Sequence, residues 1–167
     1  MGRLARFLAL ATSLAILLVP LTPTRADTAG RLTVEIQRFV KTALRNAPTH
    51  YDALRGADLH WSGSKHYHAK YPLGEFMHFC QVAGNGADAS MECATVSFRG
   101  GEDASEPAVI AAIRGALPSG FVSATPGQMV AARWEDADEA LAVELLADVS
   151  DDGSSVSYAI WISPLTR

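Results

Sequence analysis

The two cysteines of this chain bracket a run of turn-forming residues, and this arrangement limits how the middle of the chain can fold. Cys80 and Cys93 are the ends of the stretch CQVAGNGADASMEC, which is rich in Gly, Asn, Asp and Ser. Two strands joined through residues 83–90 bring positions 80 and 93 opposite each other, within the reach of a disulfide. Twelve intervening residues do not make a CxxC redox motif, and no second cysteine pair completes a zinc site. The pattern predicts a disulfide across a β-hairpin, which stabilises the fold by about 3 kcal/mol.

This disulfide requires export, because disulfides persist in oxidising compartments. The N-terminus has two arginines, an apolar segment over residues 7–21, and then a small residue, Ala26. The pattern is typical of a secretory signal peptide over residues 1–26, with an uncleaved membrane anchor as the alternative. We therefore expect a periplasmic or secreted protein with a single domain, residues 27–167, and no later membrane span.

The charge of the chain narrows the class of partner. The 167 residues include 14 Lys and Arg against 18 Asp and Glu, a net charge of −4. Residues 1–26 carry three of the basic residues and no acidic one, so the expected mature protein has a net charge of −7. Nucleic acids and anionic membranes require a cationic surface, so this balance argues against both and is compatible with a basic protein partner.

Two segments have the 3.6-residue apolar period of an amphipathic helix. In residues 32–47 the apolar side chains form one stripe, the basic ones fall mostly on the other side, and Pro48 follows. In residues 106–117 a similar stripe follows Ser105, a candidate N-cap, and precedes Pro118. We predict a helix in each segment.

Elsewhere the apolar period is two, as in strands with one buried face. The clearest strands are expected in two hairpins, residues 76–82 with 91–98 and residues 141–150 with 156–162 around the turn sequence DDGS. Shorter strands are expected at residues 52–59, 67–71, 121–125 and 129–136. In the last strand Val156, Tyr158, Ile160 and Ile162 share one face, and Ser157, Ala159 and Trp161 share the other. The sequence thus predicts an α+β fold, with two amphipathic helices packed on an antiparallel β-sheet.

The two halves of the chain, residues 32–98 and 105–163, follow a similar order of elements. Segments 39–53 and 109–123 align without a gap at an offset of seventy, and each half then ends in a predicted hairpin. The identities are few. A tandem duplication of an α-β-β-β-β unit and chance recurrence of a common pattern both stay open.

Residues 58–79, DLHWSGSKHYHAKYPLGEFMHF, combine histidines with aromatic residues. His66 and His68 are two apart, so on a strand both project from one face, a spacing that can chelate Zn²⁺ or Cu²⁺. The third ligand would be His78 or His60. No acidic residue has a spacing that would add a further metal ligand. We therefore expect a protein without a cofactor, with a metal site as the alternative.

The same stretch is a candidate contact surface, because Tyr, Trp and His combine a large apolar area with a polar tip. A second candidate, Trp134, lies beside the acidic residues of segment 135–139. The residues predicted to contact a partner are Trp61, Tyr67, His68, Tyr71 and Trp134. Aromatic residues of this kind also fill cores, so for each of them a buried position is the alternative.

The chain has none of the GxSxG, HExxH or GxGxxG motifs of common enzyme classes, so we expect neither catalysis nor catalytic residues. Its order of helix and hairpin is similar to that of the tandem α/β units of secreted β-lactamase-inhibitory proteins and of small envelope-assembly modules. The likeness is one of element order, so no residue role carries over. The sequence predicts an exported protein-binding module, such as an inhibitor or an envelope-assembly factor. The alternative is a periplasmic metal-binding protein that uses the histidines.

Overall fold

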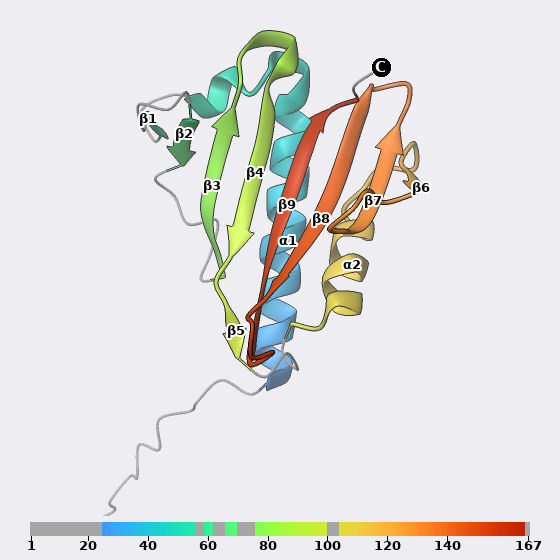
Figure 1. Ribbon diagram of the computed structural model, residues 1–167. Helices are drawn as coiled ribbons and strands as arrows, with labels where there is room; N and C mark the ends of the chain where they lie inside the picture. The colour runs from blue at the N-terminus through green and yellow to red at the C-terminus, as the bar shows by residue number, and fades with distance from the viewer. Residues whose placement is uncertain (1–24, 56–58, 62–65, 70–75, 100–103, 166–167) are drawn as a thin grey trace, which may run out of the picture.

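The computed structural model describes residues 25–55, 59–61, 66–69, 76–99 and 104–165. Within these residues nine strands form one antiparallel sheet, and the two α-helices lie on one face of it (Figure 1). The helices are α1 (Arg25–Asn46) and α2 (Glu106–Arg114), with the short 3-10 helices η1 (Ala47–Thr49), η2 (Asp52–Arg55) and η3 (Gly86–Asp88). The strands are β1 (Leu59–Trp61), β2 (His66–Ala69), β3 (Met77–Ala83), β4 (Ser90–Thr95), β5 (Phe98–Arg99), β6 (Val122–Ala124), β7 (Val130–Asp136), β8 (Leu141–Val149) and β9 (Ser155–Pro164). The α+β class predicted from the sequence is confirmed.

The strand order across the sheet is β1-β2-β3-β4-β9-β8-β7-β6, with β5 also beside β9. Both predicted hairpins form, because β3 pairs with β4 and β8 pairs with β9. The hairpins then join through β4 and β9 in the middle of the sheet. The predicted DDGS turn connects the two strands of the second hairpin. There Asp152 Oδ1 accepts hydrogen bonds from Ser154 N and Ser150 Oγ, and the bond from the Ser154 amide lowers the pKa of Asp152 to about 2.

Two predicted strands differ from the structure. The strand expected at residues 52–59 is wrong over residues 52–55, which form η2, because His50 and Tyr51 adopt positive φ and turn the chain sharply after α1. The strand expected at residues 91–98 divides into β4 and β5, since Val96 N donates to Phe76 O outside the regular ladder.

The helices also differ in extent from their predictions. Helix α1 begins at Arg25 rather than at residue 32. Its first two residues, Arg25 and Ala26, are the last two residues of the predicted signal peptide and the part of it that the structure describes. Helix α2 ends at Arg114 rather than at residue 117. The α-helical pattern stops there because Ala116 N, just after Gly115, donates its hydrogen bond to the carbonyl of Ile113, which is only three residues back. Ser105 occupies the predicted N-cap position, but its hydroxyl makes no capping hydrogen bond.

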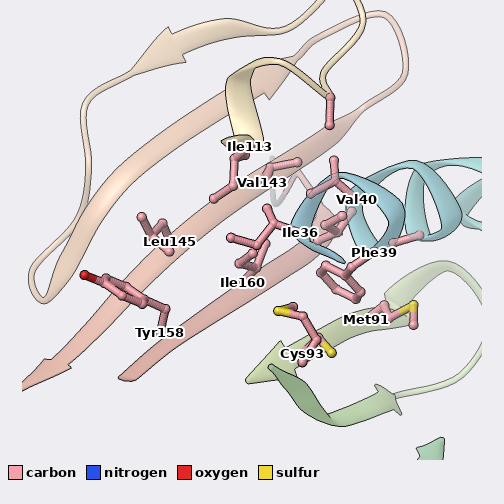
Figure 2. Close-up of a cluster of buried hydrophobic side chains, with 14 of the residues drawn as sticks. Ile36, Phe39, Val40, Met91, Cys93, Ile113, Val143, Leu145, Tyr158 and Ile160 are labelled. Carbon is pink, nitrogen blue, oxygen red and sulfur yellow. The ribbon is translucent and has the colours of Figure 1, made fainter. Parts of the chain in front are cut away.

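The hydrophobic core lies between the helices and the covered face of the sheet (Figure 2). From α1 the fully buried side chains are Ile36, Phe39, Val40 and Ala43. They meet a layer from α2 and the central strands that includes Met91, Ile113, Val143, Leu145, Tyr158, Ile160 and Ile162. Each fully buried large apolar side chain stabilises the folded state by about 1.5–3 kcal/mol. In β9 the side chains of Tyr158, Ile160 and Ile162 are buried on one face, which confirms the alternation predicted for the last strand.

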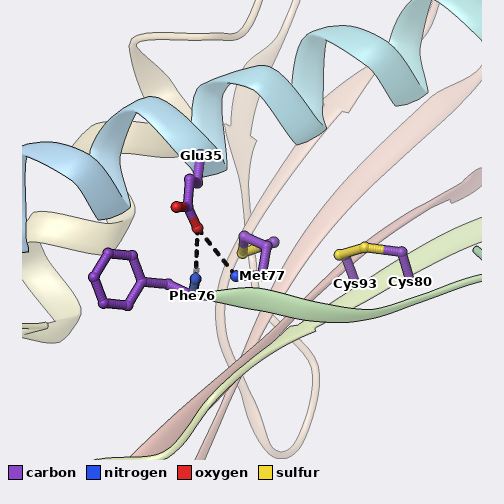
Figure 3. Close-up of a disulfide and its surroundings, with 5 residues drawn as sticks. All are labelled: Glu35, Phe76, Met77, Cys80 and Cys93. Atoms are coloured by element: carbon purple, nitrogen blue, oxygen red, sulfur yellow. Dashed lines mark hydrogen bonds between the residues drawn. A yellow bond between two sulfur atoms is a disulfide. The ribbon is translucent and has the colours of Figure 1, made fainter. Parts of the chain in front are cut away.

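The predicted disulfide is present and belongs to this core. Cys80 on β3 and Cys93 on β4 are directly opposite in register, with Cα atoms 4.0 Å apart (Figure 3). Cys93 is in turn opposite Ile160 on β9, and Ile160 is opposite Leu145 on β8. The disulfide thus continues an apolar row that crosses the four central strands, and both sulfur atoms are buried.

The strand order is symmetric about the β4–β9 pair if β1–β4 and β6–β9 are compared as two units. A two-fold axis normal to the sheet that exchanged these units would make the two helices run in opposite directions. The helices instead run the same way along β9. Ala104, which precedes α2, accepts a hydrogen bond from Tyr158 in the first half of β9, and Tyr51, which follows α1, donates one to Ile162 near its end. The structure does not show a tandem duplication.

A buried carboxylate connects α1 to the start of β3 (Figure 3). Glu35 is 7 % exposed, and its Oε2 accepts hydrogen bonds from Phe76 N at 2.7 Å and Met77 N at 3.1 Å. A carboxylate removed from water needs such partners, and hydrogen bonds to a charged acceptor are stronger than neutral ones. Glu35 therefore positions α1 along the sheet as well as packing against it.

Replacing Glu35 with alanine should lower the free energy of unfolding by about 2–3 kcal/mol, because two buried backbone N–H groups lose their acceptor. Urea denaturation followed by circular dichroism measures the difference. The neighbouring Val34→Ala is the matched control, since Val34 is 54 % exposed on the outer side of α1 and its loss should change stability by less than about 0.5 kcal/mol. Equal stability of the two variants would contradict this role of Glu35.

Candidate functional site

The face of the sheet away from the two helices carries a row of polar and aromatic side chains that crosses its five central strands. Gln81 on β3, Glu92 on β4, Trp161 on β9, Glu144 on β8 and Arg133 on β7 are each opposite the next in register. We call these five residues the open-face row. Their sequence neighbours on the same strands point into the core, so strand alternation places the row on the side away from α1 and α2. Figure 1 views the sheet from this side, with both helices behind it.

Trp161 lies at the centre of the open-face row and is 40 % exposed. Its direct neighbours across the strands are Glu92 on one side and Glu144 on the other. Side chains that are directly opposite on adjacent antiparallel strands have Cβ atoms about 4.5–5.5 Å apart, so the indole is flanked by two carboxylates. A large aromatic ring in this position offers apolar area to a partner while the flanking groups stay polar.

Hydrogen bonds hold the polar members of the row. Arg133 Nε donates to Glu135 Oε1 at 2.6 Å, and its Nη1 forms an ion pair with Glu144. The hydrogen bond to Glu135, together with the charges of both carboxylates, raises the pKa of Arg133 above its already high ordinary value. On the other side of the tryptophan, Gln81 Nε2 donates to Glu92 Oε2 at 2.6 Å. The face therefore carries three carboxylates with a single guanidinium among these residues.

Three of the five residues of the row line a depression of about 740 Å³ at one end of the sheet. Trp161, Glu144 and Arg133 line it from the strands, Asp88 from η3, and Leu165 from the segment after β9. The turn that carries η3 requires a glycine at its start. Gly84 has a φ of +72°, and a Cβ there would lie 2.7 Å from the carbonyl oxygen of Asp88.

The structure corrects the prediction for Trp134. This residue is 4 % exposed and packs in the core, because Arg133 and Glu135 occupy the outward positions of β7 on either side of it. The acidic segment that follows closes the β7–β8 turn. Asp136 Oδ1 accepts hydrogen bonds from the backbone N–H groups of Asp138 and Glu139.

For β1, β2 and His78 the structure gives backbone positions only. Trp61 on β1 is opposite Tyr67 on β2, and His60 is opposite His68, which is itself opposite Gln81 on β3. The predicted metal ligands His66 and His78 lie on β2 and β3, and Tyr71 lies outside the described residues. The side chains of His66, His68 and His78 are not described. Among the side chains that are, no group of three or more His, Cys, Asp and Glu is placed to hold a metal ion.

Comparisons with protein-family models, with curated proteins and with solved structures find no match to this chain. In the described part of the chain, neither helix has both the length and the apolarity to cross a membrane.

One feature of the sequence points to this site. The alternation in residues 156–162 placed Trp161 on the polar face of its strand, with Ser157 and Ala159. A tryptophan among small residues on that face indicates exposure. The carboxylates and the guanidinium beside it come from three other strands, so only the register of the sheet could bring them together.

Proposed function

We propose that this chain is an exported, non-catalytic protein-binding module, such as an inhibitor or an envelope-assembly factor, and that the open-face row is its contact surface. The observation that carries the proposal is Trp161, which is 40 % exposed and lines a depression on the face of the sheet away from the two helices. Tryptophan and arginine are enriched among residues that dominate protein interfaces. A rigid sheet also presents such side chains with little loss of conformational entropy on binding.

The chemistry of the row supports recognition rather than catalysis. Arg133 stays protonated at every ordinary pH because the pKa of a guanidinium lies far above that range, and its carboxylate partners raise the pKa further, so it cannot exchange a proton with a substrate. Cys80 and Cys93 are bonded to each other in the core and are not available as nucleophiles. Glu92 and Glu144 are engaged by Gln81 and Arg133, as in a surface built from mutually oriented polar groups.

Replacement of Trp161 with alanine should abolish most binding to the natural partner. The measurement is recovery of a cross-linked partner from a periplasmic extract, quantified by mass spectrometry, and we expect at least a tenfold loss, in the range of interface hot spots. Val149→Ala is the control. Val149 is 58 % exposed on β8, but strand alternation places it on the same face as the helices and not on the face of the open-face row. Undiminished recovery with the Trp161 variant, at an unchanged melting temperature, would count against the open-face row.

Export is the second part of the proposal, and the buried disulfide supports an oxidising compartment. Intact mass spectrometry of natively isolated protein should find a chain that begins at Asp27, with no cysteine alkylated unless a reductant is added first. Two free thiols on a chain that keeps residues 1–26 would contradict both the compartment and the processing site.

A metal-binding function is a second candidate, favoured by the direct pairing of His60 with His68 across β1 and β2. His66 lies two residues from His68 on the same strand, so the register supplies neighbouring imidazole-bearing positions for Zn²⁺ or Cu²⁺.

Elemental analysis of protein purified without a histidine tag tests this candidate. Stoichiometric Zn or Cu that is lost in His66→Ala is the expected result, and metal at background in the wild type contradicts it. His50→Asn is the control, since His50 lies outside the stretch and asparagine tolerates its positive φ.

A further inference from the structure

We infer that the open-face row binds a basic side chain, a lysine or an arginine, of the protein partner. This inference rests on the proposed function and specifies the chemistry of the partner. The receiving position is the indole of Trp161 together with the carboxylate of Glu92, which is its direct neighbour on β4.

The geometry suits a cation because an aromatic face and a carboxylate lie side by side. A guanidinium or ammonium group over an indole is attracted by the negative face of the ring, and tryptophan is the best of the aromatic side chains for this contact. The same cation can then reach the carboxylate beside the ring and form a charge-assisted hydrogen bond. The alkyl part of a lysine or arginine packs meanwhile on the apolar area of the ring.

Carboxylates of the same face already hold one guanidinium on the other side of the tryptophan. Arg133 forms ion pairs with Glu135 and Glu144, and Glu144 is the other direct neighbour of Trp161. A cation from a partner that packs between Trp161 and Glu92 would form the same kind of ion pair with a carboxylate beside the tryptophan and would add the contact with the indole. The chain itself therefore demonstrates that carboxylates of this face can orient an arginine.

The charge of the face selects a basic partner over an acidic one. Glu92 accepts a hydrogen bond from the side-chain amide of Gln81, which is neutral and leaves the carboxylate charge uncompensated by that contact. Asp88 adds a further carboxylate at the side of the depression. An acidic partner would bring its charge against these groups, whereas a basic one is attracted by them, and the net charge of −4 for the whole chain acts in the same direction.

The test uses short fluorescent peptides of four arginines, four lysines or four glutamates, with binding to the full mature protein followed by anisotropy. We expect the two basic peptides to bind, the acidic peptide not to bind, and the affinity to fall as salt rises. Trp161→Ala should weaken binding about tenfold, the size of a cation–π contact combined with lost packing. Glu92→Gln should weaken it several-fold.

The matched control is Asp151→Asn, which removes the same charge from the exposed turn before β9 and leaves the open-face row intact. It should change the affinity by much less than Glu92→Gln. An equal effect of the two variants would show attraction by net charge alone and would overturn the inference, as would basic-peptide binding that Trp161→Ala leaves unchanged.

The outcome also separates this inference from the proposed function. If the partner is lost with Trp161→Ala while no basic peptide binds, the contact surface stands and the basic chemistry is wrong. If the basic peptides bind at Trp161 but the wild-type protein and the Trp161→Ala variant recover the partner equally well, the proposed contact surface is wrong.

Discussion

The pairing of β4 with β9 joins the two hairpins of the chain into one sheet, and both the core and the open-face row depend on its register. On one face it sets Cys93 opposite Ile160, and on the other it sets Glu92 opposite Trp161. Because side chains alternate along a strand, a slip of one residue would place the tryptophan in the core and isoleucines in water. The loss of apolar burial in such a slip amounts to several side chains at about 1.5–3 kcal/mol each, which makes the register strongly specified.

The same division of faces explains how a domain of this size can hold the side chains of the open-face row rigidly. Helix α1 fills one side of the sheet with its apolar stripe and is positioned by Glu35, while the disulfide fixes the hairpin that carries Glu92. The polar groups of the other face are thus held by strands whose inner sides are packed. Functional side chains on such elements keep their geometry better than those on loops.

The two tryptophans show where reasoning from the sequence reached its limit. Trp134 and Trp161 both lie on strands, and the acidic residues that follow Trp134 in the chain make it the candidate that the sequence predicts. In the fold Trp134 has inward parity and fills the core, whereas Trp161 has outward parity and acquires its acidic neighbours from β4 and β8. Nearness in sequence was therefore the wrong criterion, because on a sheet the neighbours of a side chain come from other strands.

The amphipathic helices, the two hairpins, the disulfide and the alternation of β9 were determined by the sequence itself, since each depends on local periodicity, turn residues or a short loop. The tertiary structure alone decided that β4 meets β9, that the helices share one face and run the same way, and that Glu35 accepts hydrogen bonds from the start of β3. It also assembled the open-face row from five strands. These contacts join residues far apart in the chain, and they form only when the whole core closes, so no local pattern of residues could specify them.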